Sequence, residues 1–255
     1  MRYSRVYIDA IGYELAPVVY DISNACLGVL NGIVDVANRI ELGQVRAGLV
    51  VACETAREIN DATIDLLLQA KTMDAFTSML APLTGGAGAV AVLVTDASLA
   101  DGRRRVLGGT TQAAPQHYGL CRWGLTAATA PLHGLISAAR QLTCTDSIGI
   151  LKFGIDLGLR TWKAFLTRIG WAVDMVDKVI CHQVGATHRD SILRVLGLPP
   201  DKDFATFPFL GNMGTVSLPL TAALAEEREF LRPGDRVGFL GIGSGLNCLM
   251  LGVEW

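Results

Sequence analysis

The stretch KVICHQVG at positions 178–185 joins a short apolar run to a polar loop that ends in glycine. Positions 178–181 are typical of a short buried strand, because they are apolar-rich and are followed directly by polar residues. A helix is expected from about 187 to 196, since Gly197 and the two prolines that follow it end the helical pattern. A strand that leads through a loop into a helix predicts an α/β fold.

The same alternation continues towards the carboxyl end of the chain. A helix is expected over about 216–230, and the turn RPGD at 232–235 separates it from a strand at 237–241. That strand runs into a glycine-rich turn at 243–245, and a last strand at 248–253 follows. A long helix over 146–170 precedes the quoted stretch.

The amino-terminal part carries an equivalent series. Strands are expected at 18–22, 49–53 and 87–94, with a helix over 25–42 between the first two. Strand, helix and strand in that order predict a right-handed βαβ unit and a parallel sheet. A charged turn near 101–105 separates the two series, so we expect two related halves, residues 1–100 and residues 101–255.

Composition excludes several classes of protein. The 255 residues contain 22 Lys+Arg against 24 Asp+Glu, a formal net charge of -2, which excludes nucleic-acid binding by bulk charge. With 51% hydrophobic and 18% charged residues the chain is not intrinsically disordered. Neither a signal peptide nor a membrane-spanning helix is apparent, so we expect a cytoplasmic protein.

The six cysteines do not form a disulfide or zinc pattern, because no CxxC pair is present. Cys181 and His182, with His188 nearby, lack a convincing fourth metal ligand, so no metal site is expected.

Four features at predicted strand-to-loop edges are candidates for chemistry, and each has a structural alternative. Cys26 lies at the amino end of a predicted helix, where the helix dipole favours a thiolate, but free cysteines are often small buried hydrophobes. His182 follows a strand at the edge where parallel sheets bind ligands, or is a structural histidine. Asn212 precedes a helix and is otherwise a turn or capping residue. The turn at 243–245 is either a strand connection or a cradle of backbone N–H groups for an oxyanion.

Five motifs occur in an order that is similar to the thiolase superfamily. They most resemble the 3-oxoacyl-ACP synthase III enzymes and the OleA-type enzymes that condense two fatty acyl-CoAs, and the resemblance runs from about residue 18 to residue 255. The motifs are NACLG at 24–28, TGGAGAV at 84–90, CHQVG at 181–185, GNMGTVSLP at 211–219 and GIGSGLNC at 241–248. The resemblance implies a thiolase-like αβαβα layered fold of two related halves.

The resemblance also implies a Cys-His-Asn site for Claisen condensation of acyl thioesters. Cys26 would carry the acyl group, while His182 and Asn212 would donate hydrogen bonds to the oxygen of a second thioester as it becomes an enolate. The backbone N–H groups of Cys26 and of the turn Gly243, Ser244 and Gly245 would hold the oxyanion of the acyl transfer. The implied substrates are CoA or ACP thioesters, with a malonyl thioester as one option, without a tightly bound cofactor. The implied assembly is a homodimer, with neither nucleic acid nor a membrane span.

The chain departs from the family before the nucleophile, because only 25 residues precede Cys26. We therefore expect the amino-terminal half to be incomplete, without the carboxylate base that OleA-type enzymes carry there. We also expect poor solubility or loss of activity if the chain is expressed alone. Two alternatives to a condensing enzyme stay open. One is a non-catalytic remnant of such an enzyme, and the other is a thioester hydrolase that uses the same cysteine with water as the second substrate.

Overall fold

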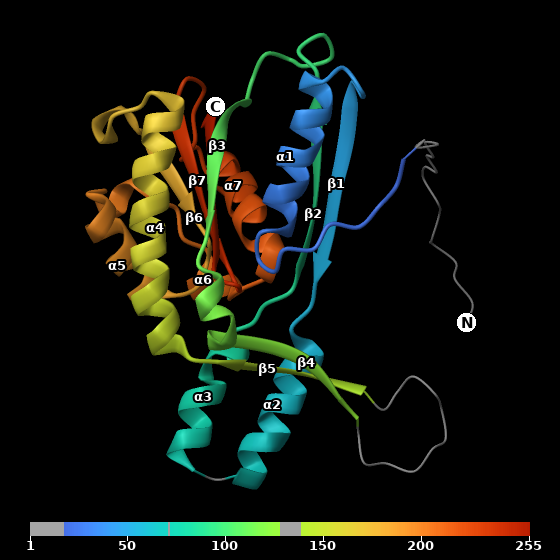
Figure 1. Ribbon diagram of the computed structural model, residues 1–255, viewed down its shortest axis with the longest axis vertical. Helices are drawn as coiled ribbons and strands as arrows, with labels where there is room; N and C mark the ends of the chain where they lie inside the picture. Colours follow the sequence, from blue (N-terminus) through green and yellow to red (C-terminus); the bar gives the residue numbers. More distant parts are fainter. Residues whose placement is uncertain (1–17, 71, 128–138) are drawn as a thin grey trace, which may run out of the picture.

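The fold is a stack of alternating helical and sheet layers in a computed structural model that describes residues 18–70, 72–127 and 139–255. Figure 1 shows, from left to right, helices α4 (Ser147–Ile169) and α5 (Ala186–Leu196), a four-stranded sheet, helices α7 (Ser217–Glu227) and α1 (Gly28–Glu41), and a two-stranded sheet. This arrangement confirms the predicted α/β class.

The four-stranded sheet is the centre of the molecule. Its order is β3-β8-β7-β6, in which β6 and β7 are parallel and the other pairs are antiparallel. The strands are β3 (Arg105–Ala113), β6 (Lys178–Cys181), β7 (Arg236–Gly243) and β8 (Asn247–Glu254). The interiors of β6, β7 and β8 are almost wholly buried, as their continuous apolar runs predict.

Strand β3 was not predicted, because its sequence is not apolar. Strand β3 pairs with β8 only because the two backbones come very close together. A Cβ on Gly109 would lie 2.1 Å from the carbonyl oxygen of Met250. Only glycine allows the two backbones to come this near.

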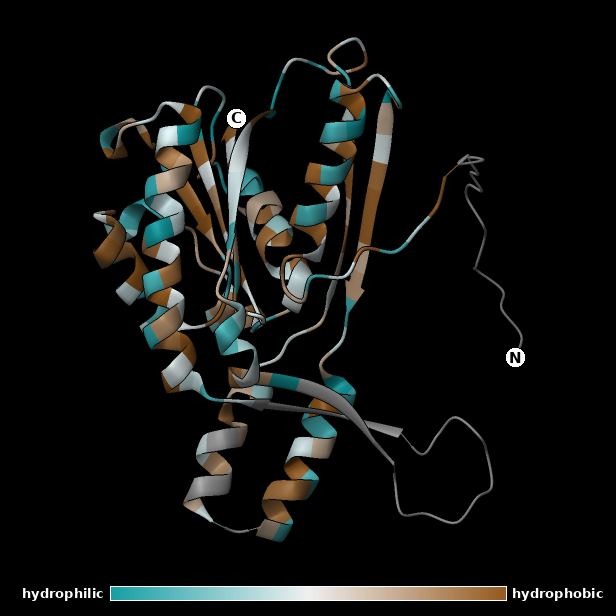
Figure 2. Cartoon of the chain, in the orientation of Figure 1, coloured by the Kyte–Doolittle hydropathy of each residue, from teal (hydrophilic) through white to brown (hydrophobic). Residues whose placement is uncertain are grey.

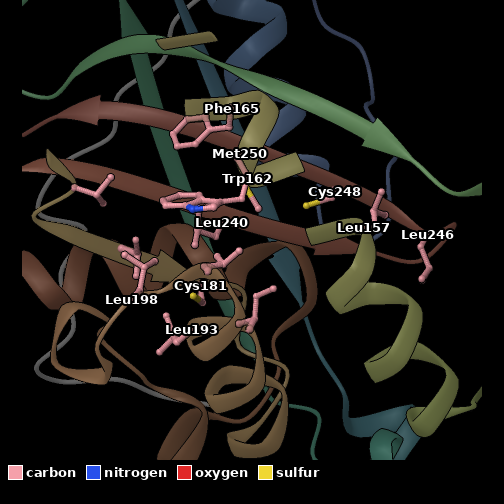
Figure 3. Packing of buried hydrophobic residues seen from close by; sticks show 14 of the residues in the cluster. Leu157, Trp162, Phe165, Cys181, Leu193, Leu198, Leu240, Leu246, Cys248 and Met250 are labelled. Atoms are coloured by element: carbon pink, nitrogen blue, oxygen red, sulfur yellow. The ribbon is translucent and has the colours of Figure 1, made fainter. Parts of the chain in front are cut away.

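Two hydrophobic clusters cover the two faces of this sheet. On one face, Trp162 and Phe165 of α4 pack over Leu240 and Met250, as Figure 3 shows. On the other face, residues of α1 and α7 pack against β7 and β8, with Leu27 and Leu30 both at most 2% exposed. Both faces of the sheet are therefore dry.

The two-stranded sheet is not part of the parallel sheet that the sequence predicts for this half. Strands β1 (Ala47–Glu54) and β2 (Gly88–Thr95) are antiparallel. Helices α2 (Arg57–Ala70) and α3 (Met73–Leu83) form a hairpin below them in Figure 1 and return the chain to the end of the sheet where β1 stops. A strand that begins at the end where its neighbour stops has to run in the opposite direction.

The predicted buried strand at 18–22 is also wrong. The structure assigns no strand to this segment, and Val19 is 85% exposed. A short apolar run indicates that a segment is able to be buried, but burial needs a partner surface, and the described residues provide none here.

Strands β1 and β2 are buried on one face only. Towards α1 the contact is close, because a Cβ on Gly48 would lie 2.7 Å from the Val36 methyl carbons. The outer face exposes Leu49, Val51 and Leu93, each above 60%. Figure 2 shows the hydrophobic colouring of β1 on the outside of the layers.

The remaining described elements are shorter. Strands β4 (Cys121–Ala127) and β5 (Ala139–Thr145) form an antiparallel pair that runs beneath the two sheets in Figure 1, and neither was predicted. The other elements are η1 (Pro115–Leu120), η2 (Val173–Met175), η3 (Pro200–Lys202), α6 (Phe207–Leu210) and η4 (Gly214–Val216). Within the described ranges, none of the helices combines the length and the hydropathy needed to cross a bilayer.

Candidate active site

Cys26 lies in a tight turn at the entrance to α1. The N–H of Leu27 donates to the Asn24 carbonyl at 2.9 Å, and the N–H of Gly28 donates to the Ala25 carbonyl at 3.2 Å. Ala25 has a φ of 43°, a left-handed conformation that a side chain rarely adopts. Cys26 is therefore two residues before the helix begins rather than inside it, at the lower end of α1 in Figure 1.

The thiol of Cys26 is held in its protonated form. Burial is the main cause that raises its pKa to about 12, and electrostatic interaction with Cys121 and Glu54 adds to the effect of burial. The prediction that the helix end favours a thiolate is wrong for the free protein, because desolvation of an anion outweighs the helix dipole at this depth.

The turn after β7 lies against the backbone of Cys26. A Cβ on Gly243 would lie 3.5 Å from the backbone nitrogen of Cys26. The side chain of Asn247 ties the two segments together, because its Nδ2 donates to the Ser244 carbonyl at 3.1 Å and to Asn24 Oδ1 at 3.0 Å. The structure thus brings the predicted oxyanion turn to the predicted nucleophile.

His182 extends strand β6 by one residue towards the same region. Its N–H donates to the Leu240 carbonyl of β7 at 3.0 Å. The next residue of β7, Gly241, contacts the start of α1, since a Cβ there would lie 2.6 Å from Leu27 Cδ2. His182 is therefore one strand away from the residues that follow Cys26.

The imidazole of His182 is neutral at physiological pH. The side chain is buried, and burial, with a smaller effect of His188, lowers its pKa to about 3. A neutral imidazole carries one N–H, so which nitrogen holds the proton decides what the ring is able to donate.

Asn212 is positioned by the glycine-rich loop that precedes β2. Its N–H donates to the Thr84 carbonyl at 2.9 Å, and its own carbonyl accepts from the N–H of Gly86 at 2.8 Å. Side chains would push the two loops apart: a Cβ on Gly86 would lie 1.9 Å from the Leu210 carbonyl oxygen. The glycines of this motif therefore hold Asn212 in place.

The side-chain amide of Asn212 has a defined orientation. Its Oδ1 accepts from the N–H of Gly214 at 3.0 Å and from the hydroxyl of Ser217 at 3.3 Å. Because both partners are on the oxygen, the Nδ2 group is the end that remains to donate elsewhere.

The loop that carries Asn212 also contacts the amino end of α1. The N–H of Val29 donates to the hydroxyl of Thr215 at 2.7 Å. Cys26, the turn at 243–245 and the loop of Asn212 therefore meet at the start of one helix.

Glu54, the last residue of β1, was not among the residues predicted for the site. A Cβ on Gly214 would lie 3.0 Å from its Oε1, and its charge raises the pKa of Cys26. A carboxylate that ends an apolar strand was the available signal, because such ends are where side chains reach a site.

The comparisons with known proteins agree with this geometry. Residues 166–255 match the family described as 3-oxoacyl-[acyl-carrier-protein (ACP)] synthase III C terminal. A relative named acyl-CoA:acyl-CoA alkyltransferase, from Shewanella oneidensis, is 54% identical over 249 residues, which cover 96% of this chain and 70% of the relative. A second protein of that name, from Xanthomonas campestris, is 34% identical, and the match covers 93% of this chain and 66% of that protein. The crystal structure of Xanthomonas campestris OleA with lauric acid and lauroyl-CoA matches with a TM-score of 0.82 at 33% identity, over 92% of this chain and 66% of that one.

The layered fold and these matches define a thiolase-like condensing enzyme, which confirms the resemblance drawn from the motifs. More narrowly, the chain belongs to the acyltransferase family of the OleA-type acyl-CoA:acyl-CoA alkyltransferases, to which the 3-oxoacyl-ACP synthase III enzymes are related. It spans about two thirds of the length of these relatives, between 66% and 70%.

Proposed function

We propose that this chain catalyses the Claisen condensation of two acyl thioesters to a 3-oxoacyl thioester through an acyl group carried on Cys26. The observation that carries the proposal is the meeting of Cys26, the turn at 243–245 and the loop of Asn212 at the amino end of α1. The relatives named acyl-CoA:acyl-CoA alkyltransferase support the substrate class.

In the first step the Cys26 sulfur attacks the carbonyl of an acyl thioester. A carbon–sulfur bond to Cys26 forms, the bond to the leaving thiol breaks, and the proton of the Cys26 thiol ends on the departing thiol. Because the pKa of Cys26 is raised to about 12, the proton leaves as the attack proceeds. The tetrahedral oxyanion is held by the backbone N–H of Cys26 and by those of Gly243, Ser244 and Gly245, with Ser244 as the main donor of the turn.

In the second step His182 and Asn212 each donate a hydrogen bond to the oxygen of a second thioester. Loss of a proton or of carbon dioxide from its α-carbon forms an enolate, and that carbon attacks the acyl carbonyl on Cys26. The new carbon–carbon bond forms while the bond to Cys26 breaks, and the released sulfur takes up one proton to regenerate the thiol. That proton balances the one lost from the α-carbon, or comes from water when carbon dioxide is lost instead. Fixed donors in a dry site are worth about 3 kcal/mol each in comparable oxyanion holes.

The assembly and the cellular setting are part of the same proposal. The resemblance to the family supports a cytoplasmic homodimer that acts on CoA or ACP thioesters without a tightly bound cofactor. It also supports a division of the chain into halves 1–100 and 101–255, with the nucleophile in the first and His182 and Asn212 in the second.

The test is acylation of the protein by radiolabelled acyl-CoA. Cys26→Ala is expected to abolish labelling, whereas Cys53→Ala, which alters an exposed cysteine of β1, is expected to leave it unchanged. Labelling that survives in the Cys26→Ala variant contradicts the proposal. Product analysis separates condensation from the hydrolase alternative, because hydrolysis gives a free acid and condensation gives a 3-oxo thioester.

A further inference from the structure

A small cavity lies behind His182, between helices α4 and α5 and the central sheet. Its volume is about 20 Å³, measured as the space open to the centre of a water molecule, and Gly154, Gly158, His182, His188 and Ile242 are among the residues that line it. Leu240, Cys248 and Met250, which line it as well, are visible in Figure 3. The lining residues that the structure describes include neither Cys26 nor any residue of α1.

Two buried imidazole nitrogens have no hydrogen-bond partner among the residues that the structure describes. They are Nδ1 of His182 and Nε2 of His188, and both residues line this cavity. Each nitrogen of a neutral imidazole either donates or accepts, and a buried polar atom without a partner is costly. Two such atoms at one cavity indicate a polar occupant between them.

The glycines of α4 create the space. A Cβ on Gly154 would lie 3.9 Å from His188 Nε2 and 2.9 Å from Ile242 Cδ1, and one on Gly158 would lie 2.8 Å from Ile192 Cδ1. Any larger residue at these positions would fill the cavity or push α4 away from α5. The helix therefore approaches closely while it leaves room beside the imidazole of His188.

Size and charge limit what is able to occupy the cavity. A water needs roughly 10–15 Å³ by this measure and at least two polar partners, so the space suits one water. Burial lowers the pKa of His182 to about 3 and that of His188 to about 4, so both rings are neutral near pH 7. A neutral molecule that both donates and accepts matches two neutral imidazoles.

We propose that one buried water bridges His188 Nε2 and His182 Nδ1, and that His188 thereby sets the tautomer of His182. In this arrangement the Nε2–H of His188 donates to the water oxygen, and the water donates to Nδ1 of His182. Since Nδ1 is then an acceptor, the single proton of His182 lies on Nε2. His188 is a positioning residue, which acts through His182 in the way that outer partners orient ligating histidines.

The consequence for catalysis rests on the proposed function. If the reactive thioester oxygen accepts from His182, the ring has to present an N–H on the side away from the cavity, which is Nε2. The opposite tautomer would present a lone pair to that oxygen and repel the enolate.

The test is nitrogen-15 NMR of the full chain with labelled histidine, which reports which ring nitrogen carries the proton. The chain has only four histidines, so single substitutions assign the signals. In the wild-type protein His182 is expected to be protonated on Nε2. In His188→Leu this preference is expected to be lost, and in His188→Gln, whose amide still donates to the water, it is expected to persist. Ile192→Val, which alters another lining residue, is the matched control and is expected to behave as wild type.

A wild-type His182 that is protonated on Nδ1 overturns the proposal, and so does a tautomer that stays unchanged in His188→Leu. The wild-type spectrum alone shows which nitrogen of His182 is protonated, so it tests the proposal even if the leucine variant does not fold. In activity assays His188→Leu is expected to acylate Cys26 normally but to lose condensation by about 10- to 100-fold in kcat, the range typical of outer-partner removal. If the wild-type protein fails to acylate Cys26, the proposed function fails, while the NMR result still decides the role of His188.

Discussion

Acidification is expected to destabilise this protein through His182 and His188, the two histidines that line the cavity. Burial lowers the pKa of His182 to about 3 and that of His188 to about 4, whereas the pKa of a histidine in the unfolded chain is about 6.5. Between these values the unfolded chain binds more protons than the folded one. The stabilising contribution is therefore complete above about pH 6.5 and is lost as the pH falls towards the folded-state pKa values.

The size of the effect follows from the pKa differences. For each histidine that stays neutral in the folded state, the free energy of unfolding falls by about 1.4 kcal/mol for every pH unit below the unfolded-state pKa. From pH 6.5 to pH 5 this is about 2 kcal/mol for each ring and about 4 kcal/mol for the pair. The His188 ring is only partly buried although its Nε2 is fully buried, so its share is an upper bound. A loss of this size is a large part of a typical stability of about 5–15 kcal/mol.

Urea unfolding at a series of pH values between 7.5 and 5 measures this dependence, with tryptophan fluorescence as the signal because Trp162 lies in the core. Burial raises the pKa of Asp203, which favours the folded state as the pH falls and so opposes the effect of the histidines. The pH dependence of stability therefore has to be compared between the wild-type protein and variants. His182→Gln and His188→Gln are each expected to reduce the slope of stability against pH, His182→Gln by about 1.4 kcal/mol per unit and His188→Gln by no more than that. If both variants keep the wild-type slope, the argument that these rings are neutral because they are buried is wrong.

Three further substitutions test the geometry of the candidate site. Asn212→Asp keeps the acceptor oxygen that binds its own loop but removes the donating amide, so condensation should fall by about 100- to 1000-fold while Cys26 acylation and the melting temperature are retained. Equal loss of both half-reactions would show that Asn212 is structural. Gly86→Ala forces the loop before β2 away from the loop of Asn212 and should lower the free energy of unfolding, measured with urea, by about 1–3 kcal/mol. The control Gly119→Ala should be close to neutral, because the nearest atom lies 3.7 Å from the new carbon. Glu54→Gln removes a negative charge beside the nucleophile, so the pKa of Cys26 should fall and alkylation by iodoacetamide at fixed pH should be faster; an unchanged rate would contradict the contact.

The sequence alone determined the elements whose signals are local. Helix α4 was predicted within one residue at both ends, because Asp146 caps its start by accepting from the N–H of Gly149 and Gly170 ends it in a left-handed conformation. Strands β6, β7 and β8 were predicted because a strand buried on both faces has to be continuously apolar. The motif resemblance to the condensing enzymes was likewise correct, since the glycines and polar residues of the motifs lie within short segments.

The tertiary structure decided what depends on partners. It made β1 and β2 antiparallel, because a helical hairpin between them returns the chain to the same end of the sheet, and it left the apolar segment 18–22 without a strand partner among the described residues. It also reversed the expected ionisation of Cys26, since the helix end visible in the sequence is outweighed by burial that only packing creates. Glu54 and His188 also became candidates only in the folded structure. Glu54 acts on Cys26, which is remote in the sequence, and His188 acts on His182 across a cavity. The packing of the chain sets both distances, and no local sequence pattern reports them.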